Sequence, residues 1–429
     1  MNAPTTKIGK EDFIHFAMGD KVAADDSGRF VTADIGSHID SDRYISEEFY
    51  NREKEAIWKH AWLLLARASV IEKPGDYFLF DLHVLDAKLI VVKGRDGKVR
   101  AFRNTCPHRG APVCYPRSGN RRFLTCPFHG WVFDLDGALL DIPDEDRFPE
   151  PIDKSKSGLM QVSADIWGGF IFINMNPETT LAEYLVPVPD ELRQYLQNEN
   201  LRWIKGYKRV FATNWKTTVD VQAEGYHANS LHKLTVAATI SPKHMPLTVY
   251  PKAKGIGYRI CTAGDPEGSY EPTEVAKLAH TYGASVYLNI GNKEDCKADK
   301  YPGAMNPNNE PLHIFDEWNF FPGVCFFVQK DHIFILRAWP LNPNETQYEI
   351  DHYFIGEFDS FKKLWSNQQG LITLRDTLTE DLSAIQGMQV NFRSGAFPVA
   401  KKFSDLEVGV LAFQRKITDW IDEHEKKNA

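Results

Sequence analysis

Four side chains of two metal-binding kinds stand in two short segments of the chain. Cys106 and His108 lie in the string CPHRG, and Cys126 and His129 lie in CPFHGW, with 17 residues between His108 and Cys126. Strand-like alternation surrounds both segments, so we expect them to be loops. Two thiolates and two imidazoles on two such loops are a complete donor set for a metal centre.

The distribution of donors over the two segments narrows the kind of centre. Zinc sites of the Cys₂His₂ kind normally have both cysteines in one half and both histidines in the other. Here each half supplies one cysteine and one histidine. A [2Fe-2S] cluster in which two histidines replace two cysteines on one iron is of the Rieske type. The sequence therefore predicts a Rieske cluster held by Cys106, His108, Cys126 and His129.

A second pair of histidines lies further along the chain. His227 and His232 are five positions apart at the end of NWKTTVDVQAEGYHANSLH, residues 214–232. In a regular α-helix such positions point apart, so joint coordination requires a bent, π-like or unwound turn. A 2-His-1-carboxylate site for non-haem Fe(II) also needs one acidic ligand. A distant Asp or Glu is expected to complete it.

These motifs together resemble the Rieske non-haem iron family of aromatic-ring-hydroxylating oxygenases, specifically the oxygenase component or alpha subunit. Residues 104–137 resemble its Rieske domain, and residues 214–232 resemble its catalytic iron motif. Respiratory-chain Rieske proteins carry an additional cysteine in each loop. In the second loop it lies between the ligating cysteine and histidine, a position that Phe128 occupies in this chain. Cys114 therefore has no partner there, and we assign it no role. The resemblance covers nearly the whole chain.

The resemblance also proposes the third iron ligand. The string EDLSAIQGMQ, which begins at Glu380, resembles the family's late Glu-Asp motif and indicates Asp381. Its neighbours Asp376 and Glu380 are expected to lie on the solvent-exposed polar face of a helix. The same position without a metal-binding role stays an alternative for Asp381.

Glu224 lies three residues before the first of the paired histidines. In the family, the members form a ring-shaped trimer, and the acid at this position bridges a cluster histidine of one subunit and an iron histidine of the next. Ring dihydroxylases have Asp at this position, whereas this chain has Glu. A carboxylate between two imidazoles orients them and couples electron transfer to protonation. We predict this bridging role for Glu224; the alternative is that Glu224 is an ordinary surface acid. For Asp220 two interpretations stay open: a residue that supports the histidines or the electron route, or a charged residue on a helix surface.

Patterning along the chain predicts an α+β protein. Spaced apolar positions from 46 to 62 indicate a helix, and short alternating runs from about 63 to 175 indicate a small antiparallel β domain. The segments 206–222 and 246–262 read as strand-like, and 263–312 reads as long loops. Strands at 318–357 precede helical patterns at 360–390 and 404–424. By resemblance, a Rieske β domain (51–170) is inserted into a helix-grip catalytic domain, an antiparallel sheet around a long helix. Residues 1–50 would be its N-terminal helical part and 171–429 the remainder.

Composition excludes several classes of partner. The net charge of -8 gives nucleic acid no reason to bind, and no run of about 18 apolar residues could span a membrane. The N-terminus lacks the apolar core of a signal peptide, so a cytoplasmic location is expected. Six cysteines in 429 residues make a disulfide framework improbable.

The resemblance implies an enzyme that uses O₂ to hydroxylate, dihydroxylate or oxidatively dealkylate an organic substrate. Phenylalanines around 320–327 favour an aromatic or largely apolar substrate, as in aromatic hydrocarbon catabolism, although aromatics at strand spacing are more often core. Because the chain lacks a Rossmann glycine fingerprint, electrons must come from a separate flavin-containing reductase, with or without a ferredoxin. NADH is the expected ultimate donor. A homotrimer is implied, with or without a small beta subunit. The competing hypothesis is a Rieske electron carrier without oxygenase activity, which would lack a third iron.

Overall fold

The computed structural model describes residues 14–16, 38–236, 240, 245–264, 273–282, 305–306, 313–329, 331–400 and 403–429. The chain forms two compact units, one of residues 1–57 with 185–429 and one of residues 58–184. We expected domain boundaries after residues 50 and 170. The second boundary falls later because β12 (Phe170–Asn174) pairs with β3 (Leu63–Arg67) and α3 (Leu181–Tyr184) contacts β11 (Gln161–Trp167).

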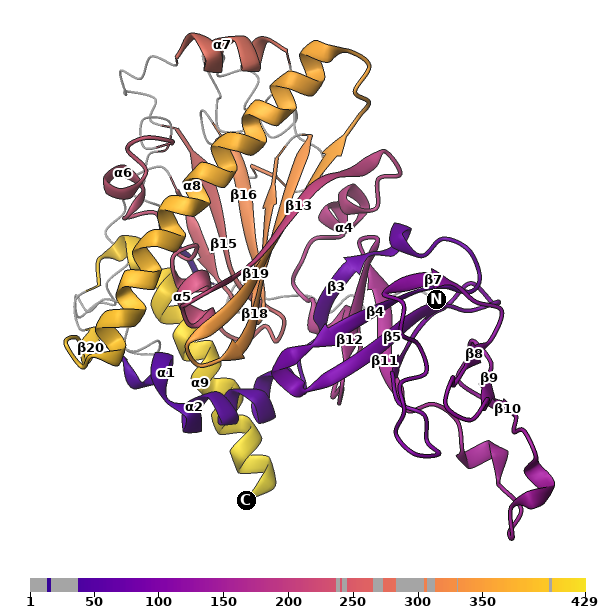
Figure 1. Cartoon of the computed structure of the whole chain (residues 1–429). Coiled ribbons are helices and arrows are strands. Elements are labelled where there is room, and N and C mark those ends of the chain that lie inside the picture. Colours follow the sequence, from indigo (N-terminus) through magenta and orange to yellow (C-terminus); the bar gives the residue numbers. More distant parts are fainter. Residues whose placement is uncertain are drawn as a thin grey trace. The chain divides into compact units, whose positions relative to one another are not determined.

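The larger unit is built on an antiparallel sheet and a long helix, α8 (Phe361–Arg393), that crosses it (Figure 1). In the described residues the sheet order is β1-β14-β15-β16-β17-β18-β19-β13. Its strands are β1 (Ile14–Phe16), β13 (Leu201–Phe211), β14 (Leu247–Val249), β15 (Ile256–Ala263), β16 (His313–Phe320), β17 (Val324–Val328), β18 (His332–Asn342) and β19 (Glu345–Ile355). The short strands β2 (Ile39–Asp40) and β20 (Val399–Ala400) form a separate pair.

Helices surround this sheet within the same unit. They are α1 (Asp42–Ile45), α2 (Glu47–Glu53), α4 (Asp190–Leu196), α5 (Trp215–Asp220), α6 (Ala228–Leu231), α7 (Glu274–Thr281) and α9 (Val408–Asn428), with a π-helical turn (Lys54–Trp58) after α2. Ser360 caps α8 by accepting a hydrogen bond from the backbone N–H of Lys363. Strands β16 and β17 are buried along their whole length, as expected for a sheet covered on both faces.

The smaller unit is an antiparallel β domain. One sheet has the order β3-β12-β11-β6-β5-β4-β7, and a small sheet has the order β10-β9-β8. The remaining strands are β4 (Asp76–Leu82), β5 (Ala87–Lys93), β6 (Val99–Arg103), β7 (Ser118–Asn120), β8 (Leu124–Thr125), β9 (Val132–Phe133) and β10 (Leu139–Asp141). The predicted α+β fold, a small antiparallel Rieske-type domain inserted into a helix-grip domain, is confirmed.

Some local expectations were wrong. The strand-like reading of 206–222 holds for β13 but fails afterwards, since Asn214 caps a helix, α5, by accepting a hydrogen bond from the backbone N–H of Lys216. The helix expected from 46 to 62 ends at Trp58. Most of the region 263–312, read as loops, lies outside the described residues, and α7 is the helix described within it. In the described residues, no helix is long and apolar enough to cross a membrane.

A buried polar network fixes the start of α5. The side-chain amide of Asn214 donates to the backbone carbonyls of Tyr44 (3.0 Å) and Pro343 (2.7 Å). Trp215 Nε1 donates to Glu53 Oε2 at 3.0 Å, and Lys216 Nζ lies 2.7 Å from Glu53 Oε1. The side chains of Glu53 and Lys216 are fully buried. The Asn-Trp-Lys string therefore attaches α5 to the N-terminal helices, and the segment that follows carries the paired histidines.

Candidate active site

The two Cys/His loops of the smaller unit have matching backbone geometry. In each, the cysteine N–H bonds to the carbonyl five residues later, and a glycine N–H bonds back to the cysteine carbonyl: Cys106 with Ala111 and Gly110, and Cys126 with Trp131 and Gly130. Both glycines have positive φ (78° and 75°), a conformation that favours glycine. The turns therefore present the cysteine and histidine side chains in a similar way.

The four predicted cluster residues come together between these loops. Cys106 and Cys126 are buried free cysteines, and burial together with the neighbouring Cys126 raises the pKa of the Cys106 thiol to about 11. The ring centroids of His108 and His129 lie 4.6 Å apart. His108 stacks on Trp131 at 4.9 Å, and its buried Nδ1 has no hydrogen-bond partner among the described residues.

This arrangement fits a [2Fe-2S] cluster. Two buried cysteines side by side, with the pKa of the Cys106 thiol raised by burial and by Cys126, and an imidazole nitrogen without a partner are the donors that such a cluster needs. The cysteines are buried, while His129 is exposed and His108 intermediate. The two histidines would thus hold such a cluster close to the surface of this unit.

The second site lies in the larger unit, where three side chains converge. His227 Nε2 and His232 Nε2 lie 3.2 Å apart, and Asp381 Oδ1 lies 3.4 Å from the first and 3.1 Å from the second. Metal–ligand bonds of about 2.1 Å at right angles separate neighbouring ligand atoms by about 3 Å. The three atoms are therefore spaced as one face of an octahedron around a single ion.

The local backbone explains how two histidines five residues apart can face the same point. His227 and His232 flank α6, a helix of four residues, and stand just before and just after it. His232 leaves the helical region with φ -89° and ψ 33°, so its ring can turn toward His227. Asp381 comes from the middle of α8 and is 3% exposed. The expected unwound turn is thus a short helix with a histidine at each end.

A carboxylate contacts Nδ1 of each histidine, the ring nitrogen that faces away from the other ligand atoms. Glu224 Oε1 lies 2.5 Å from His227 Nδ1, and Glu224 Oε2 accepts the backbone N–H groups of Tyr226 and His227. Glu380 Oε2 lies 2.9 Å from His232 Nδ1 and accepts the hydroxyl of Thr235 at 2.6 Å. With Nδ1 donating to a carboxylate, Nε2 keeps its lone pair for a metal.

Glu380 is the residue that the sequence interpretation missed, since we expected both neighbours of Asp381 to be plain surface charges. Asp376 is such a charge: its side chain is 47% exposed and pairs with Arg375. The adjacent acids Glu380 and Asp381 are the available signal, because one helix can present one acid to a metal and the next to the histidine beside it. Asp220 lies away from the triad, where it accepts hydrogen bonds from Tyr44 Oη (2.7 Å) and Gln414.

The same carboxylates set the protonation of the histidines. Burial disfavours the charged rings, but hydrogen bonds with Asp381 and Glu224 outweigh it and raise the pKa of His227 to about 10. The pKa of His232 is raised by Asp381 and Glu380 against the same burial. Positive charge at this position is therefore stabilised, whether a proton or a metal ion brings it, and the two compete for Nε2.

A small cavity of about 60 Å³ opens at the triad. It is lined by all three converging residues, by Leu374, Thr377 and Leu378 of α8, and by Thr262, Phe315, Glu317 and Phe327 of β15 to β17. Of the phenylalanines expected to line a pocket, Phe327 does so. Phe320 and Phe326 instead pack on each other at 4.6 Å, and Phe321 packs on Phe413 and Trp420.

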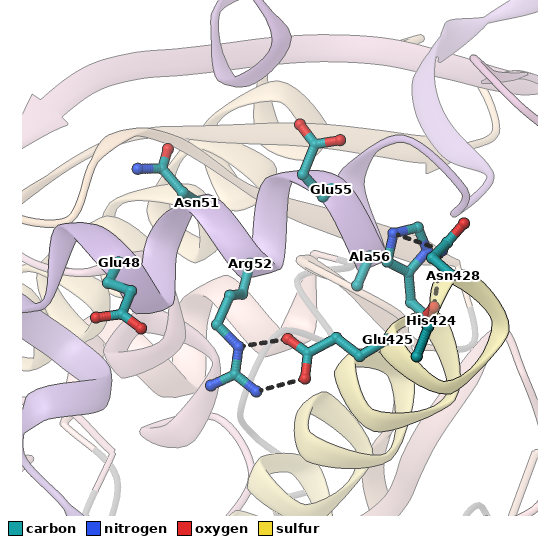
Figure 2. A pocket seen from close by; sticks show the side chains of 9 residues that line it. Glu48, Asn51, Arg52, Glu55, Ala56, His424, Glu425 and Asn428 are labelled. Atoms are coloured by element: carbon teal, nitrogen blue, oxygen red, sulfur yellow. Dashed lines mark hydrogen bonds and ion pairs between the residues drawn. The ribbon is translucent and has the colours of Figure 1, made fainter.

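Another hollow of the larger unit, of about 850 Å³, lies between α2 and α9. Arg52 and Glu425 form an ion pair at this hollow, with 2.6 Å between Nε and Oε1, and Figure 2 marks their contact with dashed lines. Most of its other lining residues are polar, among them Glu48, Asn51 and Glu55. None of the eight candidate site residues lines this hollow, so we do not consider it as the active site.

Glu380→Gln should weaken iron retention at the triad by about 10- to 100-fold, because an outer-shell partner of a ligating histidine is lost. The measurement is iron remaining after titration with a chelator, while the visible spectrum reports the cluster. Asp376→Asn, on the same helix but exposed, is the matched control and should behave as the wild type. Equal iron retention in both variants would show that Glu380 does not support His232.

Two metal sites of these kinds, a Rieske-type cluster site and a 2-His-1-carboxylate set, define the protein as a Rieske non-haem iron oxygenase. Comparison with known proteins agrees. A model of the Rieske [2Fe-2S] domain matches residues 61–156, and a model of the ring hydroxylating alpha subunit catalytic domain matches residues 198–423. The chain belongs to the ring-hydroxylating alpha-subunit family of Rieske oxygenases.

Similar proteins act on different substrates. The carnitine monooxygenase oxygenase subunit of Acinetobacter pittii is 33% identical over 82% of this chain and 85% of its own length. The glycine betaine monooxygenase oxygenase subunit of Chromohalobacter salexigens is 28% identical over 77% of this chain and 74% of its own length. Benzene 1,2-dioxygenase subunit alpha of Pseudomonas putida is also 28% identical, over 72% and 69%.

Solved structures share the fold. A quaternary ammonium Rieske monooxygenase in complex with L-carnitine superimposes with a TM-score of 0.68 at 21% identity, covering 90% of this chain and 96% of that one. Naphthalene 1,2-dioxygenase from a Rhodococcus species gives a TM-score of 0.67 at 18% identity, covering 90% and 94%.

Proposed function

We propose that this chain is the terminal component of a monooxygenase that oxidises a small quaternary ammonium compound at a carbon bound to its nitrogen. The convergence of His227 Nε2, His232 Nε2 and Asp381 Oδ1 on one cavity is the observation that carries the metal assignment. The substrate class is supported by the carnitine and glycine betaine relatives.

In this proposal Cys106, His108, Cys126 and His129 hold the [2Fe-2S] cluster, and His227, His232 and Asp381 hold one non-haem Fe(II). When bound, the cluster supplies single electrons and the mononuclear iron activates O₂. The triad supplies three ligands, which leaves the remaining positions of a six-coordinate ion for O₂. Glu224 and Glu380 keep both rings oriented with Nε2 free. The buried surroundings of Asp381 keep bulk water from the reacting carbon.

The overall reaction balances with two electrons from outside. One C–H bond of the substrate, O₂, two electrons and two protons give one C–OH group and one water. A hydroxyl on a carbon next to a cationic nitrogen makes an unstable product. Cleavage of that C–N bond releases a less substituted amine, an aldehyde and a proton, so the net result is oxidative dealkylation.

The electrons require a partner. We propose that NADH supplies them through a separate flavin-containing reductase, with or without a ferredoxin, in the cytoplasm, where NADH is available. We further propose a homotrimer, in which Glu224 joins His227 of one subunit to a cluster histidine of the next, His108 or His129, with a small beta subunit as an optional addition. Metal analysis of the purified complex together with its mass in solution tests these points.

The test of the proposed function is a single turnover. The iron-loaded protein is reduced without oxygen, mixed with trimethylammonium carboxylates, tertiary amines and aromatic hydrocarbons, and then exposed to ¹⁸O₂. We expect loss of an N-substituent and an aldehyde that carries one labelled oxygen. A ring diol with two labelled oxygens would instead support aromatic hydrocarbon catabolism. Reoxidation of the cluster without any product would favour an electron carrier, an alternative that the family membership does not support.

A further inference from the structure

Glu317 is a buried acid on the wall of the active-site cavity. It lies on β16, opposite Ile260 of β15 and Phe327 of β17 in the two neighbouring ladders. Phe315, two residues earlier on the same strand, shares its face of the sheet and also lines the cavity. The residue is 4% exposed. A carboxyl group is thus presented to the cavity from a wall whose other members are Thr262, Phe315 and Phe327.

Glu317 forms no salt bridge among the described residues, and the charges of His227 and Asp381 act on its pKa in opposite directions. Its hydrogen bonds come from neutral groups: Tyr258 Oη donates to Oε1 at 3.1 Å, and the Cys325 thiol is a second partner. The next acid in the sequence differs, since Asp316 points to the opposite face and pairs with Arg259 at 2.7 Å. Burial raises the pKa of Glu317 to about 8, against the hydrogen bond from Tyr258. A carboxylate here is costly until some other group supplies positive charge.

Aromatic rings accompany this carboxyl group. The rings of Phe315 and Phe327 lie 5.1 Å apart at 59°, and both residues line the cavity beside Glu317. Faces of aromatic rings attract quaternary ammonium groups, and a carboxylate next to them supplies the neutralising charge. The same cavity is lined by His227, His232 and Asp381, so a cation held here has its N-bound carbons beside the metal position.

We infer that Glu317 recognises the positively charged nitrogen of the substrate and sets the specificity of this enzyme for cations over neutral compounds. The inference rests on the proposed function, because it takes the cavity at the triad as the substrate site. It adds the residue that selects positively charged substrates, a preference that neither the iron ligands nor the cluster ligands determine. Glu317 does not act on the reacting bond, so its loss should change binding and leave the metal sites intact.

The experiment compares cations with neutral molecules of the same shape. Binding of glycine betaine, carnitine and γ-butyrobetaine, and of analogues with a tert-butyl group in place of trimethylammonium, is measured by calorimetry on the oxidised holoenzyme without oxygen. The wild type should prefer the cations by about 100-fold. Glu317→Gln should lose that preference, because the amide keeps an acceptor for Tyr258 and removes the charge. Glu357→Gln, an exposed acid on an ion pair with Arg202, should behave as the wild type.

Two results would overturn the inference. One is a wild type that binds none of the cations, or binds the neutral analogues as tightly. The other is a Glu317→Gln variant whose preference stays within about threefold of the wild type. Turnover separates this failure from failure of the proposed function. A wild type that dealkylates the cations while Glu317→Gln keeps the wild-type preference disproves only the role of Glu317, whereas a wild type that holds no iron at the triad or dealkylates none of the cations disproves the proposed function itself.

Discussion

Asp381→Ala should lower the iron content from about three to about two atoms per chain and reduce product formation by roughly 10³-fold or more, since even outer-shell partners of a metal cost 10- to 100-fold. Asp381 is the carboxylate of the triad, and its Oδ1 lies within 3.4 Å of both histidine Nε2 atoms. Without it, two neutral imidazoles would face an Fe(II) whose positive charge no ligand offsets. The cluster residues lie in the other unit of the chain, so the visible spectrum of the cluster should persist.

The matched control for this variant is Asp376→Ala. It makes the same change five residues earlier on α8, at a side chain that is 47% exposed and paired with Arg375. Iron content, product formation and the cluster spectrum should all match the wild type. If Asp381→Ala kept its third iron and its turnover, a different carboxylate would complete the site, and Glu380 would be the first candidate.

Glu53→Gln should lower the free energy of unfolding of the larger unit by about 3–5 kcal/mol, because it leaves the Lys216 ammonium buried without a counter-charge. Burial already lowers the pKa of Lys216, and Glu53 acts against that shift. The measurement is the urea denaturation midpoint, followed by the helical circular dichroism signal. Arg52→Ala, which removes an exposed ion pair with Glu425 in the same part of the chain, should cost less than about 1 kcal/mol.

A double replacement distinguishes lost charge from lost packing. Glu53→Met combined with Lys216→Met fills a similar volume without charge, so it should recover part of the stability that the single variant loses. Full recovery is not expected, since Trp215 Nε1 would lose its acceptor. A single variant that costs less than about 1 kcal/mol would show that the pair does not anchor α5.

The cluster loops were the most predictable part of the site. Cysteine, histidine and the closing glycine of each loop are neighbours in sequence, so their relation is set by a turn of a few residues. Gly110 and Gly130 have the positive φ that these turns require. The family resemblance therefore transferred to Cys106 and Cys126 without knowledge of the surrounding sheet.

The choice among the acids of α8 was harder. Asp376, Glu380 and Asp381 share one helix, and each residue turns the side chain by about 100°. Which of them meets the histidines depends on the rotation of α8 against α6, a tertiary property. The resemblance pointed to Asp381. The adjacent acid Glu380 was a signal of a second role, but only the packing of α8 shows that it contacts His232 Nδ1.

The sequence by itself determined the donor types, the two local motifs that carry them, and the helix and strand pattern of an α+β chain, because these depend on spacing over a few residues. The tertiary structure decided which distant side chains face one another. Asp381 reaches His227 from 154 positions away, Glu53 reaches Lys216 from 163 positions away, and Glu317 faces the cavity while Asp316 faces Arg259. Such contacts follow from the rotation of helices and the register of strands, which only the packed core fixes.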